Sequence, residues 1–111
     1  MSVLREYEKT VVQLLVSSVL SPQELDTVIR EGRLVEYDYT GCGYFLTIEH
    51  STLPTIRIAC HTPQVIGSAD GIISGFVIFI ENRELTIECH AWGDVGIPEW
   101  FRDREVQVAA T

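Results

Sequence analysis

Positive charge is scarce in this sequence, because eight Lys and Arg residues stand against sixteen Asp and Glu residues. The formal net charge is −8 at pH 7. A protein that binds nucleic acid through its phosphates needs the opposite imbalance, since basic side chains must replace the bound counterions. We therefore expect no direct contact with nucleic acid.

Long hydrophobic runs are also missing. The longest apolar run covers residues 11–20, and Gln13 and two serines interrupt it. A helix that spans a bilayer needs about twenty apolar residues, so this run is too short. Charged side chains between Arg5 and Lys9 occupy the place where the apolar part of a signal peptide would begin. We therefore expect a cytoplasmic protein with no membrane partner.

Cysteines are too few and too scattered for a disulfide framework. There are three, an odd number, and none belongs to a CxxC motif. Free thiols in a reducing compartment are the simpler interpretation. Cys60-His61 and Cys89-His90 look like a repeated pair of zinc ligands, but neighbouring residues in a strand point to opposite faces. We expect both cysteines to face the core, both histidines to face outward, and no metal or other cofactor.

Sequence signatures of enzymes are absent as well. The chain has no GKS, GKT, HExxH or GxSxG motif, and the two glycines beside Cys42 lack the third glycine of a dinucleotide-binding loop. A thiol nucleophile at Cys42 would need a nearby base, but strand rise places His50 roughly 25 Å away. Asp38 and Glu49 are both expected to be exposed, whereas acid–base catalysis by a carboxylate pair needs one of them buried. These absences favour a function that is not enzymatic, with no catalytic residue assigned.

What is present is enough apolar material for an ordered domain. Of the 111 residues, 46% are hydrophobic and 22% are charged. Such a composition is typical of folded chains rather than of disordered ones. The length fits one domain over residues 1–111.

Two helices are predicted at the start of the chain. Over residues 3–20, apolar side chains recur at spacings of three and four and form a stripe on one face. Residues 22–31 follow a helix start signal, in which Ser21 is the N-cap and Glu24 completes a capping box. A proline at the first helical position supports this start. Gly32 is expected just past the end of this helix, in the left-handed conformation.

The hydrophobic period changes to two after Gly32, as expected of strands. Strands are predicted over residues 34–40, 44–50, 55–61, 76–81, 84–92 and 105–109. Asn82 and Arg83 fit a two-residue hairpin turn. Pro63 is expected to end the third strand, and residues 64–75 are expected to be irregular.

Helices followed by strands are typical of an α+β fold. We expect two N-terminal helices packed on one face of a curved five- to six-stranded antiparallel meander sheet. The apolar side chains of each strand would then face the helices, and the alternate side chains would face solvent.

The solvent face of this sheet is the candidate partner-binding surface. It is predicted to carry Glu36, Asp38, Phe45, Glu49, Phe79, Glu88, His90 and Trp92. Arg57 is the one basic residue expected among them. Acidic side chains speed the encounter with a basic protein, and aromatic anchors contribute affinity. The competing interpretation is an ordinary solvated face, whose apolar members are covered by residues 64–75 or by the last strand.

Trp92 and Trp100 lie in one short stretch near the end of the chain. Two tryptophans so close together fit a binding anchor. They also fit a structural role, in which they close the open end of a curved sheet. Both interpretations stay open at this point.

In size, charge and helix-then-sheet order, the chain is similar to small bacterial immunity and inhibitor proteins that block basic nuclease toxins. The resemblance implies a non-catalytic protein-binding module that occludes a basic protein partner. Acidic side chains would occupy the sites that the partner uses for phosphates. This function is our first hypothesis.

Two alternatives belong to other functional classes. One is a small enzyme or a ligand-binding, barrel-like domain, which would need an enclosed cavity with convergent polar groups. Its pocket would be lined by Tyr37, Tyr39, Tyr44 and either Cys42 or His61. The other is a self-associating, chaperone-like acidic homodimer that uses free edge strands.

Overall fold

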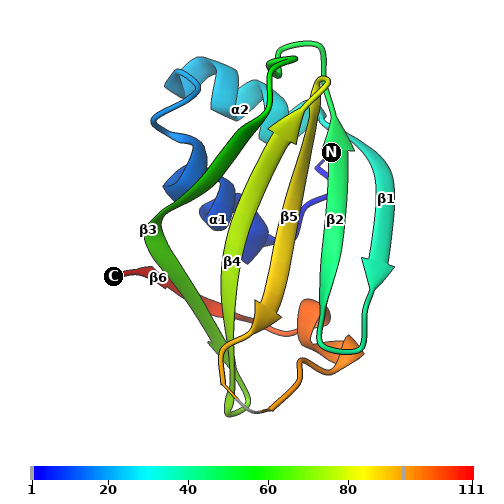
Figure 1. The fold of residues 1–111 in the computed structure, drawn as a ribbon, viewed down its shortest axis with the longest axis vertical. Helices are drawn as coiled ribbons and strands as arrows, with labels where there is room; N and C mark the ends of the chain where they lie inside the picture. The colour runs from blue at the N-terminus through cyan, green and yellow to red at the C-terminus, as the bar shows by residue number, and fades with distance from the viewer. Residues whose placement is uncertain (1, 94) are drawn as a thin grey trace.

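The computed structural model describes residues 2–93 and 95–111 and places two helices ahead of the strands (Figure 1). The helices are α1 (Glu6–Val16) and α2 (Pro22–Glu31), and a short 3₁₀ helix, η1 (Glu99–Asp103), follows the fifth strand. The strands are β1 (Arg33–Tyr39), β2 (Gly43–Glu49), β3 (Ile58–Ala69), β4 (Ile72–Glu81), β5 (Glu84–Ala91) and β6 (Gln107–Ala110).

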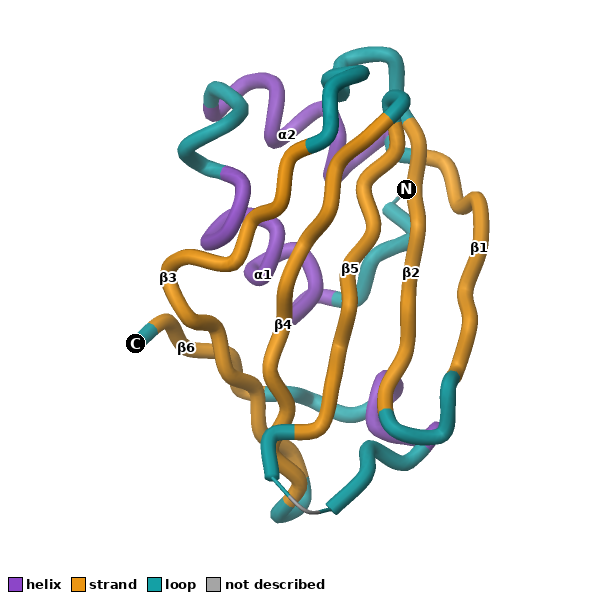
Figure 2. Tube along the Cα trace, in the orientation of Figure 1, coloured by secondary structure: helices purple, strands orange, loops and turns teal. Residues whose placement is uncertain are grey.

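The α+β fold class is confirmed. The strands form one open, six-stranded antiparallel sheet in the order β1-β2-β5-β4-β3-β6, and the helices lie on one side of it (Figure 2). Neighbouring strands are consecutive in the chain except where β2 pairs with β5 and where β3 pairs with β6. The β1–β2 hairpin therefore joins the β3–β4–β5 unit through the β2–β5 pair, which is a departure from a simple meander.

The first helix is shorter at both ends than the predicted residues 3–20. Leu4 reaches the core from the segment ahead of the helix, so its side chain extends the apolar stripe although its backbone is not helical. The Arg5 N–H donates to the Glu8 carboxylate at 2.8 Å and so satisfies one of the free donors at the helix start. Within the described residues, neither α1 nor α2 has the length and apolarity needed to cross a bilayer.

The second helix lies where its capping signal predicts. The Glu24 N–H donates to Ser21 Oγ at 3.1 Å, and the Ser21 N–H donates to Glu24 Oε1 at 2.9 Å. Gly32 follows this helix, but its φ is −56° rather than left-handed. A Cβ there would lie 2.7 Å from the Val28 carbonyl oxygen and 2.8 Å from Ile48. Glycine is therefore needed for the close approach of α2 to β2 and not for its backbone angle.

The third strand and the segment after it differ from the prediction. β3 continues past Pro63, and β4 begins well before residue 75, so residues 64–75 are mostly strand rather than irregular. The register of the β3–β4 pair shifts between Cys60 and Val65. Proline is tolerated at such irregularities, which is why Pro63 does not end the strand. The strands predicted over residues 55–61, 76–81 and 105–109 correspond to β3, β4 and β6, with different bounds.

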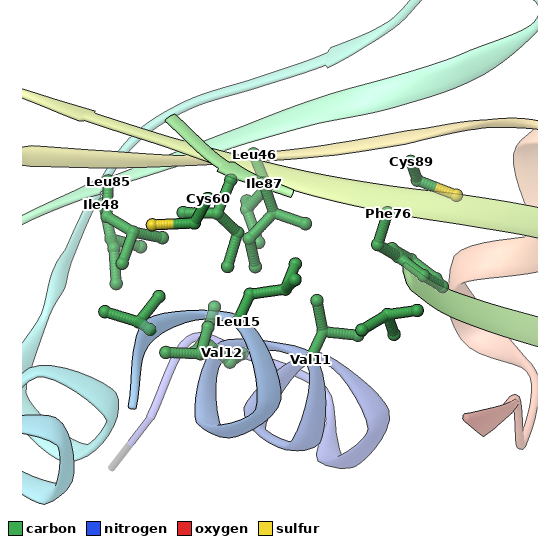
Figure 3. Close-up of a cluster of buried hydrophobic side chains, with 14 of the residues drawn as sticks. Val11, Val12, Leu15, Leu46, Ile48, Cys60, Phe76, Leu85, Ile87 and Cys89 are labelled. Atoms are coloured by element: carbon green, nitrogen blue, oxygen red, sulfur yellow. The ribbon is translucent and has the colours of Figure 1, made fainter. Parts of the chain in front are cut away.

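A layer of apolar side chains fills the space between α1 and the sheet (Figure 3). Val11, Val12 and Leu15 point from α1 toward the sheet, and each is at most 1% exposed. The sheet side of this layer includes Leu46, Ile48, Cys60, Phe76, Leu85, Ile87 and Cys89. The helices thus cover one face of the sheet, and the other face is left to solvent.

Candidate functional site

The sheet face turned away from the helices is called here the open sheet face. It carries Glu36 and Asp38 on β1, Phe45 and Glu49 on β2, Phe79 on β4, Glu88 and His90 on β5, and Trp92 just after β5. Between them along β2, β4 and β5 stand the buried core residues, as the period-two pattern predicts. The structure therefore gathers the predicted partner-binding residues on one surface.

The strand register sets Phe45 between two carboxylates. Phe45 lies directly opposite Asp38 on β1 and Glu88 on β5. Side chains at directly opposed positions have Cβ atoms about 5 Å apart. In the next row along β2 and β5, the side chains are those of Thr47 and Thr86, which are short and hydrogen-bond to each other at 2.8 Å. The Phe45 ring, 37% exposed, therefore stands between acidic side chains and beside a shorter neighbour.

Two more rings lie at the end of this face near the β4–β5 pair. His90 and Trp92 have ring centroids 6.4 Å apart, and His90 Nδ1 lies 3.4 Å from Glu88 Oε2. A Cβ at Gly75, opposite His90, would lie 2.5 Å from His90 Nε2 and 2.9 Å from the Trp92 ring. The glycine thus leaves the room that both rings occupy. Trp92 is 43% exposed and Phe79 is 36% exposed, so the face presents several partly exposed rings.

Few positive charges neutralise the acids of the open sheet face. Glu49 pairs with Arg33, a base that the sequence analysis did not place here. In the part of the chain that the structure describes, Glu36 and Asp38 take part in no ion pair, and neither does the exposed Arg57. The negative charge of β1 is therefore largely uncompensated.

Two further acids of this face, Glu81 and Glu84, were not among the residues predicted from the sequence. Glu84 lies directly opposite Glu49 on one side and Glu81 on the other. Like charges at opposed positions of a sheet repel each other, and of this row Glu49 alone has an ion-pair partner among the residues described. The sequence could have predicted Glu84 on this face, because it lies four residues before Glu88 in the same strand, and alternate residues of a strand point to the same side.

Acids elsewhere in the molecule are mostly paired. Away from the open sheet face, the Arg and Lys ion pairs are Arg5–Asp103, Lys9–Glu6, Arg30–Asp26, Arg30–Glu31, Arg102–Glu8 and Arg104–Asp70. Glu24, Glu99 and Glu105 form none within residues 2–93 and 95–111, and they lie on α2, on η1 and in the loop before β6, respectively. Uncompensated acids gather on the open sheet face and are scattered elsewhere.

A buried polar cluster lies on the helix side of the sheet. The fully buried Glu8 accepts hydrogen bonds from Tyr44 Oη at 2.5 Å and from Arg102 Nε and Nη2 at 2.9 and 3.1 Å. The Tyr7 and Tyr44 hydroxyl oxygens are 2.7 Å apart. Burial, and then the nearby Glu8 carboxylate, raise the pKa of both tyrosines above the ordinary value. The cluster joins α1, β2 and η1, and it also bonds to the backbone ahead of α1, because Glu8 accepts from the Arg5 N–H and Arg102 donates to the Val3 carbonyl.

The three tyrosines that were predicted to line a pocket do not meet in one cavity, and Tyr37 borders an open groove beside η1. Tyr44 belongs to the buried cluster, and the Tyr39 hydroxyl donates to the backbone carbonyl of residue 97 at 2.7 Å. Cys42 and His61 are exposed on separate elements, the β1–β2 turn and β3. The apolar layer in Figure 3 occupies the space between the sheet and α1.

An open groove of about 550 Å³ lies beside η1, and Tyr37, Trp100 and Arg102 are among its lining residues. The Arg102 guanidinium carbon lies 5.2 Å from the Tyr37 ring centroid, and that of Arg104 lies 4.9 Å from the Trp100 ring centroid. Trp100 is 41% exposed, whereas the neighbouring Phe101 is fully buried. Phe101 rather than Trp100 therefore packs into the core at this end of the sheet.

The predicted orientation of the cysteines and histidines is confirmed. Cys60 and Cys89 are buried at 5% and 1% exposure, whereas His61 is exposed and His90 lies on the open sheet face. Burial raises the pKa of the Cys89 thiol to about 12 and also raises the pKa of Cys60. Within the described residues, no three Cys, His, Asp or Glu side chains are grouped so that they could hold a metal ion.

The open sheet face is thus the surface on which the sequence-predicted residues meet, and function is inferred from its shape and charge. Comparisons of the chain with protein-family models, with curated proteins and with solved structures found no match.

Proposed function

We propose that this protein is a non-catalytic binding module whose open sheet face docks onto a basic protein, in the manner of an immunity or inhibitor protein. Glu36, Asp38 and Glu88 supply the negative charge. Phe45 and Trp92 supply apolar contact. Bound in this way, the module occludes the basic surface of its partner and keeps phosphates and other anions from it.

The observation that carries this proposal is the mixture of uncompensated acids and partly exposed rings on a face that none of the described helices and strands covers. Charge of one sign raises the rate of encounter with an oppositely charged protein, and buried aromatic rings carry much of the affinity. The competing interpretation had residues 64–75 or the last strand cover the apolar side chains of this face. These segments instead lie within the sheet, as parts of β3, β4 and β6. They therefore leave the face open to a partner.

Two variants with equal charge change test the proposal. The face variant carries Glu36→Gln, Asp38→Asn and Glu88→Gln. The control variant carries Glu6→Gln, Asp26→Asn and Glu105→Gln, all at exposed positions outside the sheet. Immobilised wild-type protein is expected to retain basic proteins from a native lysate of its source. The control variant should retain the same proteins, and the face variant should lose them.

Circular dichroism spectra should first show that both variants fold as the wild type does. The proposal is wrong if the wild type retains no basic protein. It is equally wrong if the face and control variants retain the same proteins in the same amounts, because the open sheet face would then make no special contribution.

A further inference from the structure

We propose that Phe45, flanked by Asp38 and Glu88, binds one arginine side chain of the basic partner. This inference rests on the proposed function and names the group that the open sheet face recognises. The planar guanidinium would lie against the Phe45 ring and donate hydrogen bonds to the carboxylates on either side.

The surroundings of Phe45 leave its ring accessible. Its same-face neighbours along β2 are Gly43, which has no side chain, and Thr47, which is 9% exposed and bonded to Thr86. Large side chains of β2 therefore do not stand beside the ring. The neighbours across the ladder are the carboxylates of Asp38 and Glu88. Among the described residues, the cation–π contacts lie at Tyr37 and Trp100 and not at Phe45.

The chain itself holds two arginines over aromatic rings. Arg102 lies 5.2 Å from the Tyr37 ring centroid, and its Nε donates to a carboxylate oxygen of Glu8 at 2.9 Å. The Arg104 guanidinium carbon lies 4.9 Å from the Trp100 ring centroid, and Arg104 Nε lies 3.4 Å from the Asp70 carboxylate. Both sites combine a ring with a carboxylate.

Phe45 has the same two components on the open sheet face, where the arginine would have to come from another molecule. Lysine fits less well, because its compact ammonium neither stacks as a plane nor donates two parallel hydrogen bonds to a carboxylate. The site is therefore expected to prefer arginine over lysine.

Phe79 is the matched control for Phe45. The two rings are 36% and 37% exposed on the same face. Phe79, however, lies opposite Thr86 and Ala59, neither of which is charged. Replacing each ring by leucine therefore compares a ring directly between two carboxylates with a ring whose nearby carboxylates, Glu81 and Glu84, are not directly opposite it.

The probes are a nine-residue arginine peptide and a nine-residue lysine peptide, titrated into wild type, Phe45→Leu and Phe79→Leu at low salt. Wild type is expected to bind the arginine peptide more tightly. Phe45→Leu should weaken arginine-peptide binding about two- to thirtyfold and abolish the preference. Phe79→Leu should weaken the binding of both peptides by the same factor. The arginine δ-methylene protons should shift upfield on binding to wild type and not on binding to Phe45→Leu.

The face variant defined above distinguishes failure of the arginine site from failure of the proposed function. Suppose that it loses peptide binding while Phe45→Leu keeps the arginine preference of wild type. The arginine site is then wrong, and the proposed function stands. If the face variant binds both peptides as tightly as wild type does, the open sheet face is not the cationic binding surface and both proposals fall.

Discussion

Arg102 links parts of the chain that are far apart in sequence. Its guanidinium donates to Glu8 on α1 and to the backbone carbonyl of Val3 at 3.2 Å, and it lies over Tyr37 of β1. Burial alone lowers the pKa of Arg102, but hydrogen bonding and charge attraction from Glu8 outweigh this effect and raise it. The side chain therefore stays charged and neutralises the carboxylate in the core.

Arg102→Ala is predicted to lower the free energy of unfolding by about 3 kcal/mol, because it leaves the charge of Glu8 buried without its partner. Arg5→Ala is the control. It removes the exposed Arg5–Asp103 pair, whose side chains are 47% and 69% exposed, and should cost less than about 1 kcal/mol. Urea denaturation at neutral pH measures both values. Equal losses would show that Glu8 does not depend on Arg102.

Stability is predicted to fall as the pH rises above about 9. The pKa of Cys89 is raised from its ordinary value of 9.0 to about 12, so above pH 9 the unfolded chain releases a proton that the folded chain keeps. This contribution to stability is complete below pH 9 and is lost as the pH rises toward 12. The raised pKa values of Tyr7 and Tyr44 act in the same direction above their ordinary value of 10.0.

Urea midpoints measured from pH 8 to pH 11 test this dependence. Cys89→Ala should show a smaller decline with pH than wild type, whereas the exposed Cys42→Ala should decline as wild type does. A midpoint that stays constant over this range would contradict the burial of these groups.

At the scale of elements, the capping box of α2 offers a local test. Ser21→Ala removes the oxygen that accepts the Glu24 N–H and should lower the free energy of unfolding by about 1 kcal/mol. Ser18→Ala changes an exposed serine ahead of this helix and should have little effect. Thermal or urea denaturation compares the two variants. If both lose the same stability, the capping box does not contribute.

Elements with local signals were predictable from the sequence. The start of α2 is set by residues within one turn, and the predicted turn at Asn82 and Arg83 sets the β4–β5 register, in which Ile80 lies opposite Leu85. β3 was not predictable, because its continuation past Pro63 depends on a register shift against β4 and on pairing with β6. A sequence read locally contains neither fact.

The same distinction holds for the sites. Alternation alone placed the predicted residues of the open sheet face on one side of the sheet. It did not reveal that Phe45 would lie between Asp38 and Glu88, because that needs the pairing of β2 with both β1 and β5. The Glu8–Arg102 pair was missed because its members are 94 residues apart.

At the scale of the whole molecule, charge is distributed unevenly. The net charge is −8, and the uncompensated acids Glu36, Asp38, Glu81 and Glu84 lie together on the face without helices. Salt screens exposed charges beyond about 8 Å at physiological ionic strength, so these acids attract a basic partner only at short range. The binding that we propose should therefore weaken strongly as salt is added.

Titration calorimetry of the captured basic protein with wild type, the face variant and the control variant tests the central claim most directly. Wild type and the control variant should bind with similar Kd values, which rise at least about tenfold between about 50 and 300 mM NaCl. The face variant should bind more than about tenfold more weakly at the lower salt concentration, with little further change as salt is added. Equal Kd values for the face and control variants would contradict the assignment of the open sheet face as the binding surface.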